Sequence, residues 1–321
     1  MRLVVLIAAL LRLTGAAQPA PAAAHSVAVV FLHGLADTRN RSGYPASPAL
    51  FHFGDTASLA QATREALPDA YVVNAVYGDR GDTGDQTFGI TGRFEDIVKA
   101  TCAQLTDDAR LVASPRVHLV GISEGALALR AMLQHPACDK LRAVSLISMA
   151  GPQAGISALP FCLPLTAEES GAPCRQIMQL IRAGVYSAQA QSSLLPFQYF
   201  MDPSLTLPDF AAKGTWIGQV NGWGPAASQT VYAKQRILSL EQMVLFRFEK
   251  DTVVGPRDSS WFAYLSGTRL LQLWEQPGWA EDVLGLRALK ESGRLLLLTA
   301  PGQHCTFGLP WFRDHVVPFL N

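Results

Sequence analysis

The segment at residues 117–125 constrains this chain more than any other part of the sequence. A β-branched apolar run leads directly into the motif G-x-S-x-G, and the helix-forming residues 126–132 follow. A tight strand-to-helix turn lifts the hydroxyl of Ser123 clear of a sheet, and glycines at 121 and 125 avoid collisions with the neighbouring strand and helix. The alternative is an ordinary turn serine between glycines. The surrounding strand and helix favour Ser123 as a nucleophile.

Further apolar runs support one fold class. Runs rich in β-branched residues and bounded by Gly, Pro or Asp alternate with helix-like segments, which is typical of a mainly parallel sheet covered on both faces. We expect strands at 27–32, 71–76, 117–120, 143–148, 243–248 and 295–299. Together with the turn at Ser123, this pattern predicts an α/β protein of the α/β-hydrolase fold.

The stretch at 150–240 interrupts this alternation. It is too long for a simple crossover and too apolar for a linker, and it contains eight prolines among scattered aromatics such as Phe197, Tyr199 and Phe200. We expect an inserted, lid-like subdomain.

A serine hydroxyl needs a base to remove its proton, and in this fold the acid and the histidine follow the serine in chain order. His304 lies in the loop directly after the strand expected at 295–299, at the sheet edge where ligands bind. His135 lies near the end of the helix after Ser123 and would point away, and His315 lies in a terminal helical segment. His304 is therefore the predicted general base.

Two aspartates compete for the role of the acid. Asp251 and Asp258 both follow the strand expected at 243–248. Asp251 is closer to the strand end, where a carboxylate can reach His304 and fix its tautomer. We predict Asp251, although loop aspartates are usually turn formers.

Backbone amides must also donate hydrogen bonds to the oxyanion that forms during acyl transfer. One comes from the residue after the nucleophile, here Glu124, and the other from the loop after an early strand. His33-Gly34-Leu35 follows the strand expected at 27–32, so the amide of Leu35 is the second predicted donor.

The N-terminus has the layout of a secretory signal peptide over residues 1–24, with an arginine, an apolar run and then small residues. A transit-like amphipathic leader is the alternative, because Arg12 interrupts the run. The run is shorter than the ~20 residues that span a bilayer, so no transmembrane anchor is expected. We expect residues 25–321 to form the exported hydrolase domain, secreted or lysosomal, and Asn40 lies in a glycosylation sequon.

Charge and cysteine spacing exclude several classes. The chain carries 26 basic and 26 acidic residues, so it has no net field for nucleic acid. The sequence contains neither C-x-x-C nor H-E-x-x-H, so we expect no metal site and no cofactor. Five cysteines in an exported chain can form disulfides and leave one unpaired. The sequence does not indicate an oligomeric state.

Several blocks resemble the palmitoyl-protein thioesterase family, in order along most of the mature chain. Residues 251–262 resemble the family's D-S-[IV]-V-x-P-x-[DE]-S-x-W-F run, and the C-terminal G-Q-H, W-F and P-F-L resemble its endings. The blocks at 147–155 and 183–187 also fit. The resemblance implies a triad of Ser123, Asp251 and His304, and an acyl-binding role for 150–240.

The resemblance also implies disulfides between Cys102 and Cys138 and between Cys162 and Cys174, with Cys305 unpaired. Three positions differ from the family pattern. Glu124 stands where the family usually has Gln, Gln303 replaces the Asp before the histidine, and Gly255 replaces an acidic residue. Glu124 brings a carboxylate close to the developing oxyanion, where it can change the rate or its pH dependence.

The function expected from these features is hydrolysis of long-chain fatty acyl thioesters, with S-acylated proteins or peptides as partners, through an acyl-enzyme on Ser123. One alternative is a lipase or carboxylesterase that acts on oxygen esters. The other is a catalytically weak acyl-binding protein that kept the fold.

Overall fold

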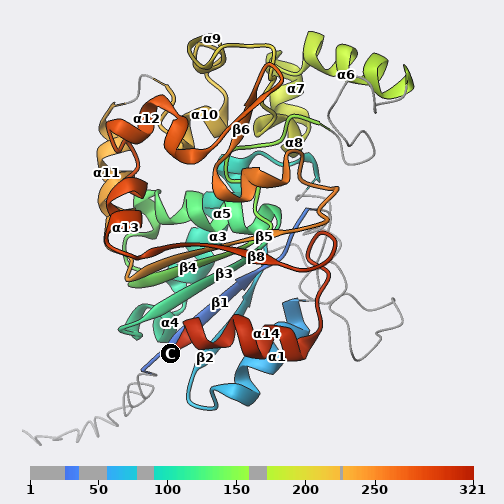
Figure 1. The fold of residues 1–321 in the computed structure, drawn as a ribbon. Coiled ribbons are helices and arrows are strands. Elements are labelled where there is room, and N and C mark those ends of the chain that lie inside the picture. The colour runs from blue at the N-terminus through green and yellow to red at the C-terminus, as the bar shows by residue number, and fades with distance from the viewer. Residues whose placement is uncertain (1–25, 36–55, 78–89, 159–171, 225–226) are drawn as a thin grey trace, which may run out of the picture.

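The computed structural model describes residues 26–35, 56–77, 90–158, 172–224 and 227–321, and the fold is described for these residues. The predicted leader, Asn40 and Cys162 lie outside them. The chain forms a central parallel sheet between two helical layers, with a further group of helices above one layer (Figure 1).

The central sheet has six strands in the order β2-β1-β3-β4-β5-β8, and every neighbouring pair is parallel. The strands are β1 (Ala28–Leu32), β2 (Tyr71–Ala75), β3 (Val117–Ile122), β4 (Ala143–Met149), β5 (Gln242–Phe248) and β8 (Leu295–Ala300). All six strands expected from the sequence are confirmed, with ends within two residues of the prediction. The predicted α/β fold class is confirmed with them.

Strand β1 illustrates why these runs form buried strands. All of its five residues are buried, as expected for a central strand of a parallel sheet covered on both faces. Val30 and Leu32 belong to one apolar cluster, while Val29 and Phe31 belong to the other. Full burial of a side chain such as Phe31 contributes about 2 kcal/mol to stability.

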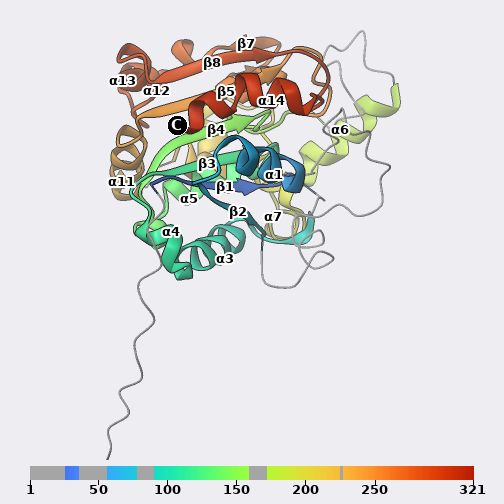
Figure 2. The same cartoon turned by 90° about the horizontal axis from the view of Figure 1, so that it is seen from below.

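The two clusters correspond to two helical layers. Helices α1 and α14 cover one face, and Figure 2 shows both lying across the strands. Helices α3, α5, α11 and α13 pack on the other face. The bounds are α1 (Thr56–Ala66), α14 (Leu309–His315), α3 (Phe94–Asp107), α5 (Glu124–Leu133), α11 (Ala227–Leu238) and α13 (Leu286–Glu291).

Between β4 and β5 the structure contains helices that extend the α3 and α5 side of the molecule (Figure 1). They are α6 (Ala172–Gly184), α7 (Ala188–Ser193), α8 (Leu195–Gln198), α9 (Leu207–Ala211) and α10 (Trp216–Val220), followed by α11. A hairpin of β6 (Tyr264–Ser266) and β7 (Arg269–Leu271) lies at the same side. Short helices α4 (Ala109–Ala113) and α12 (Pro277–Ala280) complete the set.

The carboxyl ends of the parallel strands lie at one edge of the sheet. Leu32 pairs with Gly121, Gly121 with Ser148, and Phe248 with Ala300. The loops after β1, β3, β5 and β8 therefore leave the sheet from the same edge. This edge collects the residues that the sequence singled out.

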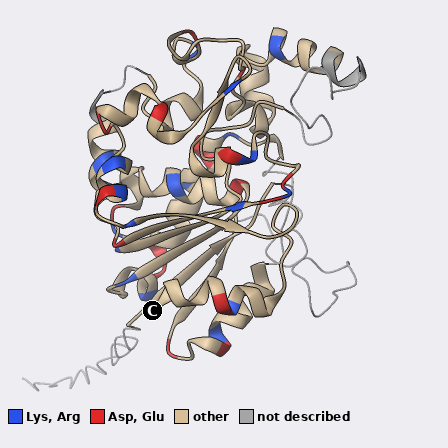
Figure 3. Cartoon of the chain, in the orientation of Figure 1, with Lys and Arg blue, Asp and Glu red and all other residues tan. Residues whose placement is uncertain are grey.

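Charged residues are dispersed over the described elements. Figure 3 shows Lys and Arg interspersed with Asp and Glu over the described elements. Within the described ranges, no helix is both long and apolar enough to cross a membrane.

Candidate active site

The turn from β3 into α5 holds Ser123 in a strained conformation. Its φ of 52° and ψ of −125° lie in a region that residues with a side chain rarely adopt. A Cβ at Gly121 would lie 2.2 Å from the Cα of Ala126, and a Cβ at Gly125 would lie 2.1 Å from the carbonyl oxygen of His33. Both positions therefore require glycine, as the sequence predicted.

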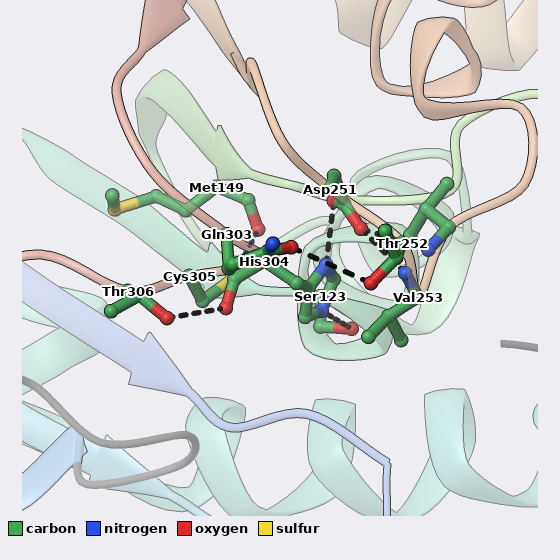
Figure 4. A network of polar contacts seen from close by, with 10 residues as sticks. Ser123, Met149, Asp251, Thr252, Val253, Gln303, His304, Cys305 and Thr306 are labelled. Atoms are coloured by element: carbon green, nitrogen blue, oxygen red, sulfur yellow. Dashed lines mark hydrogen bonds and ion pairs between the residues drawn. The ribbon is translucent and has the colours of Figure 1, made fainter. Parts of the chain in front are cut away.

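His304 lies in the loop after β8 and connects the serine with an aspartate (Figure 4). Its Nε2 is 2.9 Å from the Oγ of Ser123, and its Nδ1 is 2.6 Å from the Oδ2 of Asp251. A carboxylate at Nδ1 fixes the tautomer in which Nδ1 carries the proton and Nε2 can accept one. Ser123, His304 and Asp251 are buried, with 7%, 2% and 7% exposure.

Asp251 is fixed from its other side. Its Oδ1 accepts hydrogen bonds from the backbone amides of Val253 at 2.8 Å and Val254 at 3.0 Å. This bonding leaves Oδ2 directed at the imidazole (Figure 4). Asp258, the competing aspartate, forms an ion pair with Arg247 instead. The structure thus brings Asp251 to His304, and Asp258 does not take that place.

The segment after β1 packs directly against the nucleophile. A Cβ on Gly34 would lie 3.0 Å from the Cβ of Ser123 and 3.7 Å from its Oγ, so the backbone of Gly34 touches the serine. Leu35, half-buried, follows at the end of the described segment. The first turn of α5, which begins at Glu124, lies on the other side of Ser123. The backbone of two elements thus flanks Ser123.

The side chain of Glu124, the carboxylate expected beside the developing oxyanion, is 1% exposed. Its Oε2 accepts a hydrogen bond of 3.0 Å from the hydroxyl of Tyr199, which directly follows α8. Burial raises the pKa of Glu124 to about 8, against the opposing effect of the hydroxyls of Tyr199 and Tyr77. Burial and the nearby Glu124 raise the pKa of Tyr199 well above its ordinary value.

Sequence reasoning missed this contact because Tyr199 was treated only as one of the scattered aromatics of the insert. One signal was available. Helix α5 is buried at all ten of its positions, so a carboxylate in its first turn needs a polar partner from a covering element.

Arg130, one and a half turns further along α5, was also missed. It is fully buried, and its guanidinium donates five hydrogen bonds of 2.6 to 3.4 Å to neutral acceptors. These are Gln134, both the side chain and the carbonyl of Gln153, the carbonyl of Val220, and Asn221. Burial lowers its pKa to about 9.

Cys102 on α3 and Cys138 form a disulfide with a Cα–Cα distance of 5.1 Å, within the usual range. This pairing agrees with the family resemblance. The predicted partners Cys162 and the side chain of Cys174 lie outside the description. Cys305 is buried outside the disulfide, and its thiol donates to the carbonyl of Met149 at 3.6 Å.

The part of the chain that the structure describes contains no group of three or more His, Cys, Asp or Glu residues able to hold a metal ion. The side chains gathered around Ser123 are of the kinds that nucleophilic acyl transfer needs: a serine in a strained turn and a histidine oriented by a carboxylate.

Comparison with known proteins adds a family. The profile described as "Palmitoyl protein thioesterase" matches residues 28–304. "Palmitoyl-protein thioesterase 1" of Caenorhabditis elegans is 27% identical over 77% of this chain and 79% of its own length. "Palmitoyl-protein thioesterase 3" of Dictyostelium discoideum is 27% identical over 80% and 84%. "Lysosomal thioesterase PPT2 homolog" of Drosophila melanogaster is 24% identical over 58% and 61%.

Proposed function

The chain belongs to the palmitoyl protein thioesterase family, and we propose that it hydrolyses long-chain fatty acyl thioesters of S-acylated proteins or peptides. The observation that carries the proposal is the continuous contact from Asp251 through His304 to Ser123, with distances of 2.6 and 2.9 Å. Since the serine sits in a strained turn, its Oγ is held at the sheet edge before substrate arrives.

In the first half of the reaction, the Oγ of Ser123 attacks the thioester carbonyl while its proton passes to Nε2 of His304. Asp251 stabilises the imidazolium that forms. The backbone amides of Leu35 and Glu124 donate to the oxyanion. The C–S bond then breaks, and the departing sulfur takes the proton from His304, which leaves an ester of the fatty acid on Ser123.

In the second half, water attacks this ester and gives a proton to His304. The C–Oγ bond breaks, the proton returns to Ser123, and the fatty acid leaves. Each step is a proton transfer or an acyl transfer between groups of the chain, substrate and water. The mechanism therefore uses no cofactor.

The stretch at 150–240 supplies the acyl-binding subdomain of the proposed enzyme. A thioester already has a good leaving group, so the demand on the protein falls on recognising a long acyl chain. The aromatic side chains of this stretch support that role. Phe94 of α3 stacks on Trp216 at 4.0 Å and meets the ring of Tyr199 at 5.6 Å, which joins the insert to the hydrolase core.

We also propose that residues 1–24 direct the protein into the secretory pathway, to the lysosome or outside the cell. The disulfide between Cys102 and Cys138 supports an oxidising compartment. A relative named as a lysosomal thioesterase agrees with this route.

The test combines labelling with turnover. A fluorophosphonate probe should label the wild type and the control Ser292→Ala, an exposed serine, but leave Ser123→Ala unlabelled. Equal labelling of Ser123→Ala would reject the nucleophile.

Palmitoyl thioesters and oxygen esters of matched chain length then separate the substrates. Faster turnover of the thioester supports the proposal. Turnover of short oxygen esters alone would identify a carboxylesterase. Binding of the acyl chain with neither labelling nor turnover would identify an acyl-binding protein.

A further inference from the structure

The proposed mechanism uses only the backbone amide of Glu124 and assigns no role to its buried side chain. Its Oε2 accepts from Tyr199 at 3.0 Å, while its Oε1 is buried and accepts no hydrogen bond from any described residue. An ionised carboxylate with one oxygen buried and without a hydrogen-bond donor would carry a large desolvation cost.

The direction of the neighbouring hydrogen bonds favours the neutral acid. The hydroxyl of Tyr77, the other hydroxyl that influences Glu124, donates its proton to the carbonyl of His33 at 2.7 Å. A phenol has one proton, so the oxygen of Tyr77 is left to act as an acceptor. A carboxylic acid can donate to that oxygen from Oε1, whereas a carboxylate cannot.

We propose that Glu124 is a positioning residue that works as a neutral carboxylic acid, accepting from Tyr199 at Oε2 and donating from Oε1 to Tyr77. The resulting chain runs from the insert, through the first turn of α5, to the carbonyl of His33. That carbonyl also lies against Gly125, where an added Cβ would approach it to 2.1 Å. These hydrogen bonds therefore fix the first turn of α5 relative to the segment of His33 and Gly34. The oxyanion of the proposed reaction binds between that turn and that segment.

The inference rests on the proposed function, because it assigns Glu124 to the oxyanion amides of that reaction. Ionisation of Glu124 places a negative charge next to the site where the oxyanion develops, and it also removes the donor to Tyr77. Both effects slow acyl transfer. The neutral form is the active one.

The titratable groups around Glu124 support this assignment. They are Tyr77 after β2, His33 after β1, Tyr199 after α8 and, beside the adjacent Ser123, His304 and Asp251. Burial is the largest influence on Glu124 and raises its pKa to about 8. The ring of His33 packs on that of Tyr77 with centroids 4.5 Å apart, so the segments after β1 and β2 are in direct contact.

The test compares fluorophosphonate labelling rates of the wild type, Glu124→Gln, Glu124→Ala and Tyr199→Phe across pH. We expect the wild-type rate to fall about tenfold per pH unit above about 8, as for loss of one proton. Glu124→Gln accepts and donates in the same places but cannot ionise, so its rate should show no such fall. Glu124→Ala should be slower by about tenfold at all pH values, because the first turn is no longer held.

Tyr199→Phe gives an independent readout. Tyr199 lowers the pKa of Glu124, so its removal should move the alkaline fall to higher pH. The exposed carboxylate Glu65 provides the control, and Glu65→Gln should keep the wild-type profile.

An alkaline fall in Glu124→Gln at the wild-type pH would overturn the proposal, and so would a wild-type rate for Glu124→Ala at acidic pH. Labelling reports on Ser123 without a thioester. Normal labelling profiles together with absent thioester turnover would therefore reject the proposed substrate and leave this inference standing.

Discussion

Helix α5 has a buried ionisable side chain near each of its ends, and the two are bonded differently. Arg130 donates five hydrogen bonds to neutral acceptors, and every N–H of its guanidinium has a partner. Glu124 accepts one hydrogen bond, from Tyr199, and none at Oε1 from any described residue, so Oε1 can be bonded only when it carries a proton. Arg130 is fully bonded in its charged form, whereas the bonding of Glu124 depends on its protonation state.

This comparison leads to a division of roles along one helix. Changes in the triad should alter reactivity with little effect on folding, changes around Arg130 should do the reverse, and changes at Glu124 should alter how both depend on pH. Four substitutions test the division.

Asp251→Asn should give the largest effect, a loss of about 10⁴-fold in kcat. An amide at this position no longer selects the tautomer of His304 that accepts the serine proton. The free energy of unfolding should change little by comparison. Hydrolysis of a palmitoyl thioester measures the loss, with Asp258→Asn as the control because Asp258 pairs with Arg247. Equal losses in both variants would contradict the assignment.

Arg130→Met should destabilise the protein by about 4 kcal/mol. The change leaves buried acceptors on Gln153, Val220 and Asn221 without their donor. Urea unfolding measures the effect, and Arg142→Met, at an exposed position, is the matched control. An unfolding free energy equal to that of the control would show that the acceptors find other partners.

Glu124→Gln should change how stability depends on pH. The folded-state pKa of Glu124 is raised from 4.5 to about 8, so the folded protein holds a proton that the unfolded chain releases above 4.5. The stabilisation is fully present below 4.5 and is lost as the pH rises toward 8, at about 1.4 kcal/mol per pH unit.

Glu124→Gln cannot ionise, so its free energy of unfolding should not fall in this way as the pH rises. Urea unfolding of both proteins between about pH 5 and about pH 8 should therefore show the variant gaining relative to the wild type. Parallel curves would mean that Glu124 is ionised in the folded protein.

Gln134→Leu should give the smallest effect, a destabilisation of about 1 kcal/mol. Gln134 accepts only one of the five hydrogen bonds of Arg130, at 3.1 Å. In the double variant with Arg130→Met, the total destabilisation should be smaller than the sum of the two single effects, because both substitutions remove the same bond. Full additivity in urea unfolding would show that the bond contributes nothing.

The sequence predicted what depends on local pattern. Strand β1 is a continuous apolar run, and the turn at Ser123 is specified by two glycines, so both could be recognised without knowledge of the rest of the chain. The positions of Asp251 and His304 followed from chain order and from the rule that parallel strands end at one edge.

The contacts of Glu124 and Arg130 could not be predicted in this way. Tyr199 is 75 residues from Glu124, and Asn221 is 91 residues from Arg130. Both pairs depend on how the stretch between β4 and β5 folds back over α5, and no local pattern encodes that packing. The disulfide between Cys102 and Cys138 was likewise implied only by the family resemblance.

The bonding of Arg130 also limits how a substrate can enter. Gln153 lies on the stem through which the chain leaves β4, and Val220 and Asn221 lie on the returning stem at the C-terminal end of α10. One guanidinium clamps both stems to the helix that follows the nucleophile, and Asn221 adds a bond of 3.1 Å to Gln153. Among the described residues, both stems are therefore held at the base of the insert. Rearrangements that admit an acyl chain must occur beyond the stems, while the floor of the site stays in place.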